Sequence, residues 1–271
     1  MDLSLIAAER QNFRYISMHA CDSAVKSGIA IILVVLYLIA PADVFAGPPF
    51  RTDDPEPVEY RHGEVYLFST GTRDSGGISG VGPAIEFNYG IFPDTQFHII
   101  TPVAFNSPQG SASHFGYGDT EVGIKYRFVH QTAVIPDIGT FPLIEVPSGD
   151  AHKGLGNGKA QYFLPVWLQK DFGKWTTYGG GGYWINPGAG NKNWWFSGIL
   201  LQYSFTETFY LGGEIFHQTS DTVDGKNNTN FNLGGSFPLT KKVQLLFTAG
   251  SGLQHASTNY YSYYVALYYA F

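Results

Sequence analysis

The sequence is poor in sulfur and in charge. Among 271 residues it has one cysteine, Cys21, and two methionines. Cys21 precedes an apolar run that we expect to be cleaved off, so the mature chain would have no thiol for disulfides or metal ligation. Charged residues make up 14% of the chain, against about 25% in average soluble proteins. No basic run indicates a nucleic-acid partner.

Helical periodicity and metal-ligand spacing are also lacking. After residue 46 no useful length of chain repeats its apolar residues at the helical period. The eight histidines show no i, i+2 pair on one strand face, so we expect neither a metal site nor another cofactor. Aromatic residues make up 16% of the chain, which also has 33 glycines. This composition is typical of an all-β membrane protein with aromatic girdles and glycine-rich turns.

The first 46 residues predict a signal peptide. Residues 28–40 form an apolar run too short for a transmembrane helix. Lys26 precedes this run, and the sequence VFA, ending at Ala46, offers small residues where a signal peptidase reads. The segment before the run is long, so Met18 is an alternative translation start. An uncleaved membrane anchor is the competing interpretation.

Residues 260–271 alternate at the strand period and carry apolar or aromatic side chains at every second position. Their length suits a membrane-crossing strand. A bare apolar edge strand invites aggregation, whereas a closed barrel pairs its last strand with its first. The ending resembles the signal that the barrel-assembly machinery recognises, and we assign that signal to Leu267, Tyr269 and Phe271. The closing strand of a soluble β-sandwich is the alternative.

The alternation predicts a transmembrane antiparallel β-barrel of twelve strands over residues 62–271, with short turns at one end and long loops at the other. The expected strands cover residues 62–73, 81–91, 95–105, 118–129, 133–146, 159–171, 174–186, 194–205, 208–218, 228–238, 242–253 and 260–271. Short periplasmic turns would place both termini on the periplasmic side. Residues 47–61, rich in proline and acids, would form an irregular lead-in, either periplasmic or inside the lumen.

Strand parity places polar residues inside the barrel. Glu121, Lys125 and Arg127 alternate with apolar residues, and a lipid-facing Lys or Arg near mid-membrane costs about 2–4 kcal/mol. Adjacent like charges need acids opposite, so we expect Lys125 or Arg127 to pair with Glu145 on the next strand. The expected lumen and selectivity residues are Glu86, Glu121, Lys125, Arg127, Glu145, Glu214, Phe163 and Trp167.

Prolines, glycines and aromatics within the expected strands carry further predictions. Pro142 and Pro165 predict bulges or bends. Glycines 179–182 allow close approach of an inward segment or a ligand, or relieve curvature strain. Aromatic residues at strand ends, Trp184 and Phe216 among them, predict two girdles at the headgroup levels.

Several stretches resemble a bacterial family named for the MetA pathway of phenol degradation. The similarity is carried by residues 47–57 (GPPFRTDDPEP), 116–128 (GYGDTEVGIKYRF), 142–150 (PLIEVPSGD), 163–188 (FLPVWLQKDFGKWTTYGGGGYWINPG) and 211–219 (LGGEIFHQT). The Gly-Asp-Thr-Glu-x-Gly-x-Lys-Tyr-Arg run is the most specific of these. The resemblance implies an outer-membrane barrel linked to the uptake of small compounds, aromatic ones among them.

These features predict a channel or transporter in the bacterial outer membrane, surrounded by its lipid, for passive uptake of small aromatic or amphipathic solutes. Charged side chains at inward-facing strand positions need water or ionic partners. Twelve strands enclose more room than the eight-stranded barrels, whose interior side chains can fill. A plugged barrel with a structural or adhesive role is one alternative. A lipid hydrolase using His255 and Ser257 is less favoured, because no third catalytic residue can be named.

Cleavage after Ala46 is directly testable. N-terminal analysis by mass spectrometry of the protein extracted from membranes should find Gly47 as its first residue. Residues upstream of Gly47 in the mature protein would refute this cleavage site.

Overall fold

The computed structural model describes residues 48–271, so the expected signal peptide and its cleavage site lie outside the described residues. In this part of the chain the only helix is η1 (Ala151–Lys153), a short 3-10 turn. No helix there is long and apolar enough to cross a membrane. The strands are β1 (Gly63–Asp74), β2 (Gly77–Phe92), β3 (Thr95–Pro108), β4 (His114–Tyr117), β5 (Thr120–Val129), β6 (Asp137–Thr140), β7 (Leu143–Val146), β8 (Gln161–Phe172), β9 (Trp175–Ile185), β10 (Trp194–Ser204), β11 (Tyr210–Gln218), β12 (Asn228–Pro238), β13 (Val243–Gly252) and β14 (Asn259–Ala270).

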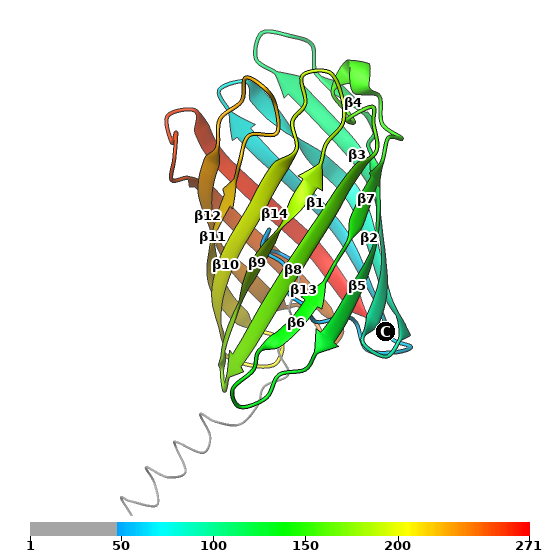
Figure 1. The fold of residues 1–271 in the computed structure, drawn as a ribbon, viewed down its shortest axis with the longest axis vertical. Coiled ribbons are helices and arrows are strands. Elements are labelled where there is room, and N and C mark those ends of the chain that lie inside the picture. Colours follow the sequence, from blue (N-terminus) through cyan, green and yellow to red (C-terminus); the bar gives the residue numbers. More distant parts are fainter. Residues whose placement is uncertain (1–47) are drawn as a thin grey trace, which may run out of the picture. The chain divides into compact units, whose positions relative to one another are not determined.

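The strands close into one antiparallel barrel (Figure 1). β4 and β5 lie end to end along β3, and β6 and β7 lie end to end between β5 and β8. Each of these two pairs fills one position in the wall, so residues 48–271 form twelve barrel strands. The predicted barrel and its strand number are confirmed.

The first and last strands close the ring. β1 pairs with β14 from Glu64 opposite Ala270 to Asp74 opposite Asn259. Beyond this ladder, the N–H of Gly63 donates to the carbonyl of Phe271 (2.8 Å), and the N–H of Phe271 donates to the carbonyl of Gly63 (2.9 Å). The Phe271 ring covers Gly63, where an added Cβ would lie 2.5 Å from the ring. The terminal aromatic is therefore part of the closure itself.

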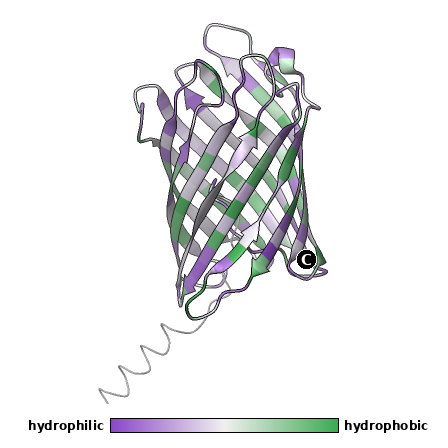
Figure 2. Ribbon diagram, viewed as in Figure 1, coloured by the Kyte–Doolittle hydropathy of each residue, from purple (hydrophilic) through white to green (hydrophobic). Residues whose placement is uncertain are grey.

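Hydrophobic and hydrophilic residues alternate along the strands (Figure 2). In β2, Ile85 is 51% exposed and Glu86 only 5%. In β5, Ile124 and Tyr126 are exposed, whereas Lys125 between them is buried. Because a strand turns successive side chains to opposite faces, an apolar outer belt and a polar interior follow from the same sequence pattern.

The fifth expected strand, residues 133–146, is the least regular. It begins only at Asp137 and is interrupted between Thr140 and Leu143. Pro142 has no N–H to give to the ladder, and its carbonyl instead accepts a hydrogen bond from the N–H of Ile124 (3.2 Å). A bulge or bend was predicted at Pro142; the strand is instead interrupted there without a change of register. The three-residue turn expected before this strand is wrong, because residues 130–136 connect β5 to β6.

The first hairpin also differs from the expectation. A loop over residues 74–80 was predicted, but Ser75 and Gly76 alone connect β1 to β2. The Asp74 side chain accepts hydrogen bonds from the N–H groups of Gly76 and Gly77 (2.7 and 3.1 Å). Gly77 has φ 144°, which favours glycine, so both strands extend further than the sequence indicated.

Three aromatic residues assigned to the girdles point inward instead. Trp184 and Phe216 are 8% and 2% exposed and pack in a lumenal cluster with Phe196. Trp194 packs against the same cluster and stacks on Trp184, with ring centres 5.3 Å apart. The girdle prediction is wrong for these three residues, because their positions along the strands face the interior, whereas Trp195 is exposed on the outer face.

Deleting Phe271 should impair assembly, because the closing strand loses two backbone hydrogen bonds and the ring over Gly63. Heat-modifiability gels of outer-membrane fractions should show less folded protein than wild type. Phe92→Ala removes an exposed aromatic from the end of β2 and serves as the control. Wild-type levels of the truncated protein would count against an assembly role for the terminal residues.

Candidate transport pathway in the barrel lumen

Residues 48–59 run through the inside of the barrel, and we call them the lumenal segment. The carbonyl of Pro49 accepts a hydrogen bond from the Thr248 hydroxyl on β13 (3.0 Å). The N–H of Val58 donates to the Gln96 side chain on β3 (2.8 Å). Thr52 has no exposed surface, and it packs against Gly198 on β10, where an added Cβ would lie 2.1 Å from the Thr52 hydroxyl. Contacts on β3, β10 and β13 mean that the segment crosses the lumen.

Glu214 on β11 anchors the start of this segment. Its carboxylate accepts hydrogen bonds from the N–H groups of Arg51 (2.9 Å) and Thr52 (2.7 Å), and from the Asn232 side chain (2.7 Å). Hydrogen bonds to an ionised group contribute about 1.5–3 kcal/mol each. Glu214 therefore satisfies backbone groups that would otherwise be buried without partners, which the sequence analysis did not foresee.

Lys125 holds the middle of the segment. Its ammonium lies 2.9 Å from the Asp53 carboxylate and 3.4 Å from that of Asp54. It also lies over the Phe141 ring, 5.1 Å from the ring centre. A buried ammonium needs such partners because its desolvation is expensive. Lys125 thus binds the lumenal segment and not Glu145.

Arg127 holds the end of the segment at the short-turn end of the barrel. Its guanidinium contacts Asp94 (3.0 Å) in the β2–β3 turn, Glu56 (3.5 Å) and Asp137 (3.5 Å). Burial acts to raise the pKa of Asp94, but hydrogen bonds from Arg127 and His130 outweigh it and hold that pKa below its usual value. The expected pairing of Lys125 or Arg127 with Glu145 is wrong for both bases.

Glu145 has a different neighbour. It lies directly opposite Glu121 in the β5–β7 ladder. The Glu121 carboxylate lies within hydrogen-bond distance of Nε2 of His98 (2.9 Å). The other ring nitrogen of His98 lies 2.7 Å from Asn88 Oδ1. The register continues unchanged across the interruption at Pro142, from Tyr126 opposite Thr140 to Glu121 opposite Glu145.

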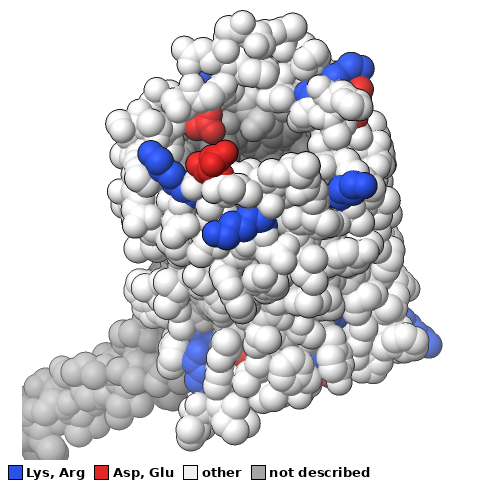
Figure 3. Space-filling model, turned by 45° about the horizontal axis from the view of Figure 1, so that its top comes forward, with Lys and Arg blue, Asp and Glu red and all other residues white. Residues whose placement is uncertain are grey.

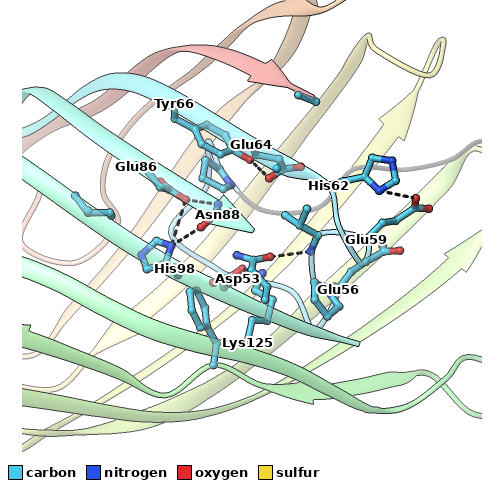
Figure 4. Close-up of a pocket in the computed structure, with 18 of the residues that line it drawn as sticks. Asp53, Glu56, Glu59, His62, Glu64, Tyr66, Glu86, Asn88, His98 and Lys125 are labelled. Atoms are coloured by element: carbon cyan, nitrogen blue, oxygen red, sulfur yellow. Dashed lines mark hydrogen bonds and ion pairs between the residues drawn. The ribbon is translucent and has the colours of Figure 1, made fainter. Parts of the chain in front are cut away.

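Acidic groups on β1 and β2 form a second polar cluster, shown in Figure 4. Glu86 accepts a hydrogen bond from Asn88 (2.8 Å) and lies 3.6 Å from His98. Glu64 accepts from the hydroxyls of Tyr66 (2.8 Å) and Tyr268 (2.9 Å). These carboxylates are satisfied mainly by neutral donors and histidine on the wall.

Phe163 and Trp167 line the opposite wall on β8 and are buried in the aromatic cluster. Phe163 stacks on Trp184 with ring centres 4.8 Å apart. Gly180 and Gly182 on β9 lie beneath these rings: an added Cβ would meet Trp167 at 3.0 Å and Phe163 at 2.6 Å. The glycine run therefore lets aromatic rings of the neighbouring strand approach the wall closely. The sequence had predicted instead the approach of an inward segment or a ligand, or relief of curvature strain.

A cavity of about 680 Å³ remains between the lumenal segment and the wall formed by β1, β2, β3 and β5. Of the expected selectivity residues, Glu86, Glu121 and Lys125 line it. Arg127, Glu145, Glu214, Phe163 and Trp167 do not appear in its lining. Figure 3 looks toward the long-loop end and shows a hollow between the loops, with acidic side chains at its rim.

The sequence analysis missed the acids that meet the lumenal bases. Asp53, Asp54 and Glu56 come from the lead-in and not from a strand. The acidic, proline-rich composition of residues 47–61 indicated these acids. The alternation of side chains along a strand, however, does not predict where the side chains of a segment without strands point. In residues 48–271 no group of three or more His, Cys, Asp or Glu side chains is placed to hold a metal ion.

Twelve antiparallel strands, an apolar outer belt and a polar lumen with a cavity define a transmembrane antiparallel β-barrel. The chain belongs to the family described as "Putative MetA-pathway of phenol degradation", whose model matches residues 67–271. No curated protein sequence matches the chain.

Solved structures with the same fold are channels and porins. The COG4313 outer membrane channel from Pseudomonas putida F1 has a TM-score of 0.65 at 16% identity, over 84% of this chain and 100% of that one. The NanC porin has a TM-score of 0.51 at 10% identity, over 76% and 98%. The KdgM porin, solved with disordered oligogalacturonate, has a TM-score of 0.50 at 10% identity, over 77% and 99%. At these identities the likeness shows the fold alone.

Removing the Glu214 carboxylate should loosen the lumenal segment. We expect Glu214→Ala to expose the bond after Arg51 to trypsin, because the N–H groups of Arg51 and Thr52 lose their acceptor. Mass spectrometry of the digest in detergent would detect the new cleavage. Glu207→Ala, in an exposed turn, should leave the wild-type digest unchanged, and equal protection in both variants would show that Glu214 does not anchor the segment.

Proposed function

We propose that this protein is an outer-membrane channel through which small solutes pass passively, with its width set by the lumenal segment. The cavity beside that segment is the observation that carries the proposal. Carboxylates, amides and two histidines line much of it, and charges inside a membrane protein are stable only where they are hydrated or paired. The channels and porins that share the fold support the same interpretation.

The position of the segment implies a narrow passage. It binds β5, β11 and β13 through Lys125, Glu214 and Thr248, so it crosses the lumen and leaves the cavity between itself and the wall of β1, β2, β3 and β5. Glu86, Glu121 and Lys125 face this remaining space, and we assign selectivity to them. Arg127 and Glu214 position the segment, while Phe163 and Trp167 fill the wall opposite.

The two alternative functions have less support. A hydrolase based on His255 and Ser257 would need these side chains to interact, yet both lie in an exposed loop, where the described contacts of His255 are made by its backbone carbonyl. A purely structural barrel would leave the polar cavity without a role.

Lys125→Met tests the constriction. The change leaves the Asp53 and Asp54 carboxylates without their cation, and breaking a buried pair in this way costs about 3–5 kcal/mol. The segment should detach, and planar-bilayer recordings of refolded protein in KCl should show a larger unitary conductance than wild type.

Lys226→Met changes an exposed loop lysine and is the matched control, with conductance expected to equal that of wild type. Wild-type conductance in Lys125→Met would show that the segment does not set the width. Absence of any conductance in the wild-type protein would contradict the channel proposal and favour a plugged, structural barrel.

A further inference from the structure

One of the basic residues that line the cavity forms no ion pair with a described residue. Its basic lining residues are Arg51, His62, His98 and Lys125. His62 lies 3.7 Å from Glu59, His98 lies 2.9 Å from Glu121, and Lys125 lies 2.9 Å from Asp53. The Arg51 guanidinium has no ion pair or hydrogen bond with any described residue; its contact is the Phe216 ring, 5.3 Å from the guanidinium carbon.

The acids of the same cavity are already engaged. Asp53 and Glu56 bind Lys125 and Arg127 on the wall. Glu64 is held by two tyrosine hydroxyls, and Asp171 accepts from the Thr176 hydroxyl. Glu59 and Glu121 pair with histidines, and Glu86 accepts a hydrogen bond from Asn88. Every carboxylate in the cavity lining therefore has a partner. Arg51 is therefore the lining charge whose hydrogen-bonding capacity is unused.

The backbone of Arg51 is fixed by hydrogen bonding, while its guanidinium contacts Phe216, interacts electrostatically with Glu214 and forms no hydrogen bond with a described residue. Its N–H is bound by Glu214 (2.9 Å), and the next residue, Thr52, is completely buried. The Arg51 residue nevertheless keeps a large exposed surface although it lies inside the barrel. The Phe216 ring, 5.3 Å from the guanidinium carbon, supports the cation without accepting its N–H hydrogen bonds in the manner of a carboxylate.

A guanidinium presents paired N–H donors that match the two oxygens of a carboxylate. Phe50 and Pro48 of the same segment line the cavity with Arg51, whereas Phe216 contacts the guanidinium but is buried outside the lining. We propose that Arg51 binds the carboxylate of a small organic anion whose apolar, aromatic body contacts Phe50 and Pro48. This inference rests on the proposed channel function and names the class of solute for it.

Calorimetric titration of the refolded full chain in detergent tests the binding without requiring conduction. Benzoate is the probe, acetate tests the aromatic body, and benzylamine tests the sign of the charge. Wild-type protein should bind benzoate more tightly than acetate and much more tightly than benzylamine. Arg51→Gln should weaken benzoate at least about tenfold, because a charge-assisted hydrogen bond is lost.

Arg61→Gln is the matched control. Its guanidinium also lies over an aromatic ring, Tyr60, at 4.9 Å, but Arg61 does not line the cavity. Benzoate affinity should be unchanged in this variant. Arg51→Gln should fold normally, because the anchoring bonds to Glu214 come from the backbone.

Three results would overturn the inference: no benzoate binding by wild type, equal benzoate affinity in wild type and Arg51→Gln, or benzylamine binding as tight as benzoate. KCl conductance separates this failure from that of the proposed function. A barrel that conducts KCl but ignores benzoate refutes the anion site alone, whereas a barrel that binds benzoate through Arg51 without conducting refutes the channel alone.

Discussion

Backbone hydrogen bonding in a medium without water is the constraint on which this structure depends. In lipid, unpaired N–H and C=O groups cost several kcal/mol each, so a sheet can cross only as a closed ring. The β1–β14 ladder supplies that closure, extended by the two bonds between Gly63 and Phe271. Once the ring is closed, alternation along each strand decides which side chains meet lipid and which meet the lumen.

Polar side chains that face inward still need partners, and here a segment without strands provides many of them. Lys125 and Arg127 on β5 meet acids of residues 48–59, and Glu214 on β11 meets backbone N–H groups of the same residues. Wall and segment therefore depend on each other: without the segment, a buried lysine would lack its carboxylates. A buried ion pair is weak evidence for stability, but removing one of its two members strongly destabilises the fold.

The sequence predicts the wall well because a period of two is a strong and redundant signal. The burial of Lys125 between exposed Ile124 and Tyr126 follows from it directly. Contacts between elements were less predictable. The partner of Lys125 depended on the path of an irregular segment, and the position of Glu145 opposite Glu121 depended on the register between β5 and β7. Trp184 and Phe216 show that parity is a better guide to the facing of an aromatic than its distance from a strand end.

The lumenal segment is covalently continuous with β1, and this makes it a tethered ligand of its own barrel. Its occupancy is independent of protein concentration, since a short tether gives a local concentration of about millimolar or more. Individually modest contacts, such as the 3.5 Å pair between Arg127 and Glu56, then suffice to keep it in place. Any solute that shares the lumen must use the space which this intramolecular competitor leaves free, or compete with a ligand that cannot diffuse away.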